Sequence, residues 1–190
     1  MAEWRHLCID MQRMFSDDTP WNVPWMPRVM PQVLEIVSRY PEQTVFTRFI
    51  PPQTAAEAPG MWKDYYEKWS MMTREQIDPE LLHLVPELDY FTPPARVFDK
   101  MVYSPWMDGR LHAHLQTARV STLVISGGET DVCVLSAILG AIDLGYEVVL
   151  LSDATCSGAD ETHDASLKLL GDRFSVQLEI MTTQEFLDGI

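Results

Sequence analysis

The chain has 190 residues, 46% of them hydrophobic, and its 28 acidic and 14 basic residues give a formal charge of −14 at pH 7. Such an acidic surface repels phosphate backbones and anionic membranes, so neither nucleic acid nor a membrane is expected as a partner. No apolar run is long enough to span a bilayer, and residues 1–12 lack the basic and apolar regions of a secretory signal. We therefore expect a single cytoplasmic domain, residues 1–190.

Predicted strands and helices alternate along the chain, as judged from apolar spacing and β-branched runs. In chain order they are a strand at 4–9, a helix at 28–39, a strand at 44–49, a loop at 51–60, helices at 61–69 and 79–84, a strand at 96–99, a helix at 109–118, a strand at 122–126, a helix at 130–144, a strand at 147–151, a helix at 161–170, a strand at 176–180 and a helix at 183–187.

This alternation is typical of βαβ units and predicts an α/β fold. We expect a three-layer α/β/α sandwich around a six-stranded, mostly parallel, Rossmann-like sheet. The strands at 122–126 and 147–151 are almost entirely apolar, which indicates burial on both faces. Ligand sites in such sheets lie at the carboxyl ends of the strands, so the residues that follow each strand are the first candidates for function.

Three strand ends carry polar residues of complementary chemistry. Asp10 follows the first strand, Lys100 follows the third, and the fourth leads into Cys133. Thr130 is expected to cap the helix that starts there, which would place Cys133 in its first turn. A helix N-terminus and a nearby ammonium both favour a thiolate. Asp10 would then move the thiol proton.

Each residue also has a simpler interpretation. The three cysteines of the chain, Cys8, Cys133 and Cys156, show no metal-like spacing, which favours reduced thiols over a disulfide framework. Cys133 alone is typical of a small apolar residue that packs a helix start. Asp10 alone is typical of a strand-end cap, and Lys100 alone of a solvated charge. Only their joint placement favours catalysis.

Three blocks resemble the isochorismatase-like cysteine hydrolases. The longest is GGETDVCVLSA at 127–137, followed by Gly-Tyr at 145–146 and Asp-Ala at 153–154. Residues 9–12 are similar to the opening Asp-x-Gln of that family, and residues 100–104 to its Lys-x-x-Tyr-Ser block. The blocks occur in the family's order and extend over nearly the whole chain.

The resemblance implies a role for each residue. Cys133 would be the nucleophile, Asp10 the general base and acid, and Lys100 the cation that activates the thiol. A non-proline cis peptide would join Gly128 to Glu129, so that the N–H groups of Glu129 and Cys133 form an oxyanion hole. Relatives are commonly dimers or tetramers, so a homo-oligomer is expected.

Two features depart from relatives. Glu129 stands where many relatives have a small or apolar residue, and its carboxylate would repel anionic substrates, bind a cationic one or point into a subunit contact. The metal-binding nicotinamidases of the family carry histidines after the second strand, whereas residues 47–53 hold none. We predict no metal and no cofactor.

Aromatic residues are frequent in the predicted loops and short helices, and we expect Phe15, Tyr103 and Trp106 to bind the substrate because they are close in sequence to Asp10 and Lys100. The alternative is that these aromatics pack a lid or a subunit interface.

The sequence thus predicts a metal-independent cysteine hydrolase that cleaves a C–N bond of a small amide, carbamoyl or ureido compound through a thioester. One alternative is an isochorismatase-type vinyl ether hydrolase that uses Asp10 as an acid, although relatives with that activity generally lack the cysteine. The other is a catalytically silent binding or assembly module. A nucleotide-binding protein is disfavoured, because residues 127–130 lack the P-loop glycine spacing and lysine.

Overall fold

The computed structural model describes residues 3–190, in which six parallel strands form one sheet in the order β3-β2-β1-β4-β5-β6. The chain enters in the middle of the sheet, builds outward to one edge and then crosses to build the other half. The connections that leave β1 and β4 therefore run toward opposite edges of the sheet. Ligand sites in such sheets form at this reversal point. The strands are β1 (Trp4–Ile9), β2 (Thr44–Phe49), β3 (Arg96–Lys100), β4 (Thr122–Gly128), β5 (Glu147–Cys156) and β6 (Leu178–Met181).

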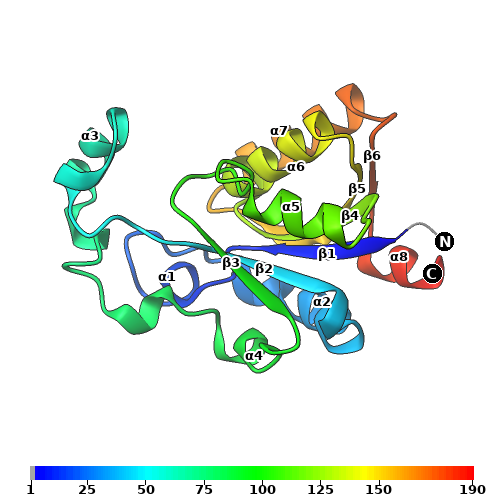
Figure 1. The fold of residues 1–190 in the computed structure, drawn as a ribbon, viewed down its shortest axis with the longest axis horizontal. Helices are drawn as coiled ribbons and strands as arrows, with labels where there is room; N and C mark the ends of the chain where they lie inside the picture. Colours follow the sequence, from blue (N-terminus) through cyan, green and yellow to red (C-terminus); the bar gives the residue numbers. More distant parts are fainter. Residues whose placement is uncertain (1–2) are drawn as a thin grey trace.

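Helices cover both faces of the sheet and complete the predicted three-layer sandwich, with α5, α6 and α7 on one face and α2, α4 and α8 on the other (Figure 1). This confirms the α/β fold class. The helices are α1 (Arg13–Ser16), α2 (Met26–Arg39), α3 (Met61–Lys68), α4 (Pro86–Asp89), α5 (Arg110–Thr117), α6 (Leu135–Asp143), α7 (Asp160–Arg173) and α8 (Thr183–Asp188).

Each face of the sheet has its own apolar core. Val33, Ile36 and Val37 of α2 are buried on one side. Their helical spacing, visible in the sequence, matches the stripe that faces the sheet. On the other side Ala137 and Ile138 of α6 are fully buried among strand residues. The small side chains of α6 allow this helix to approach the sheet closely, next to the turn that carries Cys133.

Several predicted boundaries differ from the structure, most clearly at β4, β5 and β6. Strands β4 and β5 continue to Gly128 and Cys156, beyond the predicted ends at 126 and 151, because polar and glycine residues still pair there. The last strand starts only at Leu178, since Val176 lies in a turn and is 94% exposed. The four-residue helices α1 and α4 were not predicted, because one turn leaves no periodic pattern.

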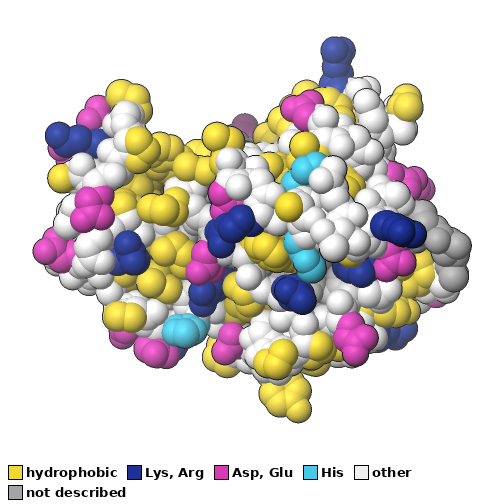
Figure 2. Space-filling model, viewed as in Figure 1, with side chains coloured by type: hydrophobic (Ala, Val, Ile, Leu, Met, Phe, Trp, Pro, Cys, Tyr) yellow, Lys and Arg dark blue, Asp and Glu magenta, His cyan; other side chains and the backbone are white. Residues whose placement is uncertain are grey.

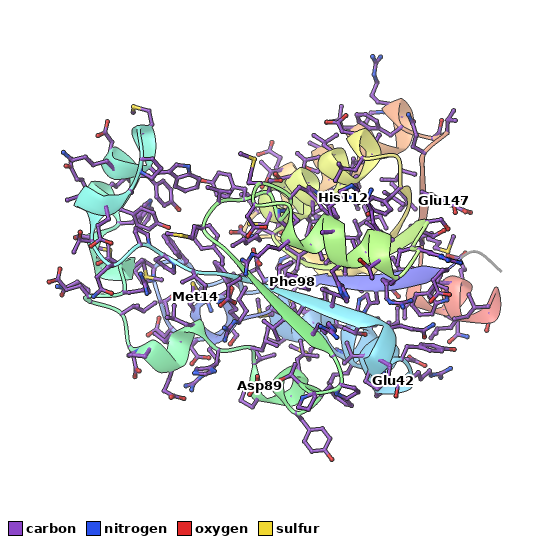
Figure 3. All side chains as sticks on the ribbon, in the orientation of Figure 1. Met14, Glu42, Asp89, Phe98, His112 and Glu147 are labelled. Atoms are coloured by element: carbon purple, nitrogen blue, oxygen red, sulfur yellow. The ribbon has the colours of Figure 1, made fainter. Side chains whose placement is uncertain are left out.

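The chain between β2 and β3, residues 50–95, carries α3 and several short turns at the carboxyl end of the sheet. Figure 1 shows α3 at the end of the molecule opposite the two termini. In Figure 3, Met14 lies toward this end and Glu147, at the start of β5, toward the other. Figure 2 shows hydrophobic side chains gathered between α3 and the upper helices.

Large apolar side chains reach the surface at Met61 of α3 and at Met101 and Met107 after β3. Such side chains are compatible with the homo-oligomer expected from the sequence, which stays a prediction. None of the helices within residues 3–190 combines the length and the apolar character that a bilayer crossing requires.

Gly127 is essential to the close contact between β1 and β4. It pairs with Ile9, has a φ of +107°, and an added Cβ would overlap the backbone of Ile9. Both the backbone conformation and the space exclude a side chain. We predict that Gly127→Ala lowers the free energy of unfolding by about 3 kcal/mol or more.

The matched control is Gly145→Ala, at a φ of +86° with no atom within 4 Å of the added Cβ. It should cost only the conformational strain, about 1 kcal/mol. Urea unfolding followed by circular dichroism measures both variants, and equal losses would contradict the proposed close contact.

Candidate active site

The ends of β1, β3 and β4 bring Asp10, Lys100 and Cys133 together, as their positions in the sequence predict. The ammonium nitrogen of Lys100 lies 2.6 Å from Oδ2 of Asp10 and 3.5 Å from Sγ of Cys133. All three side chains are buried, Asp10 and Lys100 at only 1% and 7% exposure. The contact therefore takes place in a site from which bulk water is largely excluded, where charge interactions are strong.

Neighbouring strands hold Asp10 in place. Its backbone has a φ of 50°, a left-handed conformation that aspartate tolerates better than most residues. The hydroxyl of Thr47, on β2, donates to Oδ1 of Asp10 at 2.6 Å. Just beyond, the side-chain amide of Gln12 pairs with the backbone N–H and C=O of Phe49, at 2.6 and 3.1 Å. Gln12 thereby fixes the ends of β1 and β2 relative to each other.

Lys100 is held by three kinds of contact. Besides Asp10, its ammonium donates to the carbonyl of Val102 at 3.2 Å and lies 5.0 Å from the ring centre of Phe49. Burial is the largest single effect and disfavours its charged form, but the charges and hydrogen bonds around the ammonium, those of Asp10 first, together outweigh burial and leave the pKa of Lys100 above its usual value. The ammonium and the carboxylate therefore form a charged pair.

The surroundings of Cys133 disfavour the thiolate, whereas the sequence pointed only to groups that favour it. Burial and the negative charge of Asp10 raise the pKa of the Cys133 thiol well above its ordinary value of 9.0, and Lys100 offsets this only in part. The sequence indicates an ammonium and a helix start near the thiol, but not the larger cost of desolvation.

The turn that carries Cys133 also differs from the predicted capped α-helix. Residues Thr130–Val134 form one π-helical turn, and α6 begins only at Leu135. Thr130 does not cap it. Its hydroxyl donates to the carbonyl of Cys156 at 3.1 Å and lies 2.8 Å from Nδ1 of His163 on α7. Because the hydroxyl hydrogen is used, His163 donates to Thr130, and the turn is tied to β5 and α7. The peptide bond between Gly128 and Glu129 is cis.

A cavity of about 260 Å³ opens over Cys133, and half of its lining residues are aromatic. The lining residues are Phe15, Pro20, Trp21, Asn22, Phe49, Tyr65, Tyr103, Glu129, Val132 and Cys133.

Of the three predicted substrate-binding residues, Phe15 and Tyr103 line this cavity and Trp106 does not. The indole N–H of Trp106 donates to the carbonyl of Ala137 at 2.9 Å, and its ring stacks on Tyr146 at 5.9 Å. It fills the space above Gly140, where a Cβ would overlap the indole. Trp106 therefore packs against α6, and its closeness in sequence to Lys100 gave the wrong placement.

Sequence reasoning did not single out four residues at this site. Phe49 and Thr47 lie on the end of β2, between β1 and β3, and the strand order would have pointed to them. Trp21 and Tyr65 belong to the irregular segments, where no periodic pattern indicates direction. Glu129, whose role the sequence left open, also lines the cavity.

The described residues hold no group of three or more His, Cys, Asp and Glu side chains able to bind a metal ion. The residues at the end of β2, where histidines were considered, are Phe49, Ile50 and Pro51. The donor set at this site therefore does not fit a resident metal, and metal independence stays a prediction.

The sequence model of the isochorismatase domain matches residues 6–185. The chain belongs to the isochorismatase domain family. This confirms the resemblance seen in the three sequence blocks.

Individual members of the isochorismatase family are only distantly similar. A probable inactive nicotinamidase of Arabidopsis thaliana is 35% identical over 69 residues, which are 36% of this chain and 35% of the relative. An uncharacterized isochorismatase family protein of Bacillus subtilis is 31% identical over 80 residues, 42% of this chain and 41% of the relative. The matches thus span well under half the length of these curated relatives.

Solved structures match over the whole fold. A cysteine hydrolase from Pseudomonas syringae pv. phaseolicola superposes with a TM-score of 0.84 at 22% identity, over 98% of this chain and 91% of that one. N-carbamoylsarcosine amidase from Thermoplasma acidophilum gives 0.77 at 14% identity, over 95% and 96%. At such identities the likeness concerns the fold.

The raised pKa of the Cys133 thiol leads to a test. We predict that iodoacetamide labels Cys133 slowly at neutral pH and that the rate still rises above pH 9.0, because only the thiolate reacts. Asp10→Asn removes a negative charge that raises the pKa of the thiol, so the labelling rate at a given pH below 9.0 should increase.

Mass spectrometry of the intact protein over time measures the rate, and Cys133→Ala reports any labelling of the buried Cys8 and Cys156. A wild-type rate that already levels off at neutral pH would mean that Cys133 is a thiolate at rest.

Proposed function

We propose that this isochorismatase family protein is a metal-independent cysteine hydrolase that cleaves a C–N bond of a small amide, carbamoyl or ureido compound. The observation that carries the proposal is the contact of Lys100 with both Asp10 and Cys133, at 2.6 and 3.5 Å, beneath an aromatic cavity. A nucleophile, a proton acceptor and a cation are the parts that covalent acyl transfer requires.

In the first half of the proposed reaction, Sγ of Cys133 attacks the substrate carbonyl carbon while its proton passes to the Asp10 carboxylate. The backbone N–H groups of Glu129 and Cys133 would hold the oxyanion. The tetrahedral intermediate then breaks its C–N bond, and Asp10 returns the proton to the leaving nitrogen. The products are an amine or ammonia and a thioester on Cys133.

In the second half, water attacks the thioester, and Asp10 again accepts a proton. The C–S bond breaks, the thiol regains its proton and the carboxylic or carbamic acid leaves. Lys100 stays charged throughout and donates to Oδ2 of Asp10 at 2.6 Å. A neutral resting thiol suits this cycle, because a thiolate in the same cavity would carry a second negative charge next to Asp10.

The thiol does this chemistry without a metal in our proposal, since the described residues gather no ligand set for one. The name of the Thermoplasma acidophilum neighbour, an N-carbamoylsarcosine amidase, supports C–N cleavage on this fold. The Arabidopsis thaliana relative, a probable inactive nicotinamidase, keeps the silent module as an outcome to be tested.

The test begins with a screen of small amides, carbamates and ureas for ammonia release. With a substrate found, we predict that Cys133→Ala lowers turnover by about 10⁴-fold or more, because the nucleophile is lost. Asp10→Asn should lower it by about 10²–10⁴-fold, because the amide keeps the shape but accepts no proton.

Circular dichroism of both variants controls for folding. Near-parental turnover by Cys133→Ala would contradict the covalent mechanism and would favour Asp10 acting as an acid on a vinyl ether. If the wild type binds small amides but turns none of them over, the catalytically silent binding module is favoured instead.

A further inference from the structure

The carboxylate of Glu129 has no role in the proposed hydrolysis, although it lines the cavity over Cys133. Its side chain is half-buried, and Oε2 accepts the backbone N–H of Gly158 at 3.2 Å. One hydrogen bond leaves most of the acceptor capacity of a carboxylate unused. A buried charge with so few partners is expensive unless something else compensates it.

No positive charge of the described residues lies in the cavity wall, which contains neither lysine nor arginine. The ammonium of Lys100 is already bound to Asp10 at 2.6 Å. Asp131, two residues from Glu129, adds negative charge nearby and helps to raise the pKa of Glu129, after the larger effect of burial. Among the described residues, Glu129 is therefore the one charged side chain of the cavity wall, and the wall offers an anionic substrate group no side chain of opposite charge.

Aromatic rings form the rest of the wall. The ring centres of Phe15 and Trp21 lie 6.3 Å apart in a stacked arrangement, and those of Tyr103 and Phe49 lie 6.4 Å apart in another. The ring centre of Trp21 lies 6.0 Å from that of Phe49 and 6.0 Å from that of Tyr65. The faces of such rings attract cations, most strongly when the cation is removed from water. Rings and one carboxylate around a small cavity are the chemistry that recognises an ammonium group.

We propose that the substrate hydrolysed at Cys133 is a small amide or ureido compound that carries an ammonium group, which Glu129 and the aromatic wall bind. Hydrolysis of this compound rests on the function proposed above, whereas its binding does not. At about 260 Å³ the cavity is below the usual range for drug-sized ligands, about 300–1,000 Å³, so the molecule is small. The formal charge of −14 favours the approach of a cation.

Two amides of nearly equal shape test the charge preference. Betaine amide carries a trimethylammonium group, and 3,3-dimethylbutanamide carries a neutral tert-butyl group in the same place. Their binding is measured by calorimetry on Cys133→Ala, in which neither is consumed. We expect betaine amide to bind at least about tenfold more tightly. Equal affinities would overturn the proposal.

Glu129→Gln keeps the shape of the side chain and an acceptor for the N–H of Gly158, so it removes only the charge. Combined with Cys133→Ala, it should reduce the preference to about threefold or less, the part that the rings retain. The control is Asp131→Asn. Oδ1 of Asp131 accepts a hydrogen bond from the hydroxyl of Ser157 at 2.5 Å, and Asp131 does not line the cavity. Asp131→Asn should change the ratio of the two affinities by less than about twofold. If Glu129→Gln leaves this ratio unchanged, the proposed role of Glu129 is contradicted.

Ammonia release from the two amides by the wild type is measured separately. Tight binding of betaine amide without release would contradict the hydrolase proposal and leave the ammonium site standing. Release from both amides at equal efficiency, with equal affinities, would support the hydrolase and reject the ammonium site.

Discussion

The buried ion pair between Asp10 and Lys100 is the interaction on which the site depends. The two charges lie 2.6 Å apart with almost no exposure to water, and each would be costly to bury alone. Thr47, Gln12 and the ends of β1, β2 and β3 hold the pair in position. The sheet must therefore keep its register for the pair to form, which links the fold directly to the chemistry.

Burial has the largest effect on the pKa of the Cys133 thiol and raises it, and the same ion pair acts on it next. A lone lysine next to a buried cysteine would favour the thiolate, but Asp10 neutralises that effect and adds a negative charge close to the sulfur. The thiolate is therefore disfavoured, and in the proposed mechanism the thiol loses its proton to Asp10 only when it attacks the substrate.

Much of this arrangement could be predicted from the sequence, and the failures have physical causes. Alternating elements and polar strand ends indicated the sandwich, the parallel sheet and the meeting of Asp10, Lys100 and Cys133. Desolvation of Cys133, the bonding of Thr130 to β5 and α7, and the position of Trp106 all depend on contacts between distant segments. Local spacing carries no information on such contacts, so the cap at Thr130 and the placement of Trp106 at the cavity were predicted wrongly, and the raised pKa of Cys133 was not foreseen.

The most direct test of the account is to trap the covalent intermediate on Cys133. A substrate found by the screen is mixed with the wild-type protein, quenched in acid within one turnover, and the peptides are analysed by mass spectrometry. The account predicts the mass of the acyl or carbamoyl group on the peptide that contains Cys133, and its release by hydroxylamine, as expected of a thioester. The account would be contradicted if turnover proceeds at full rate while Cys133 stays unmodified at every quench time. The same must hold when low temperature slows the second half of the reaction.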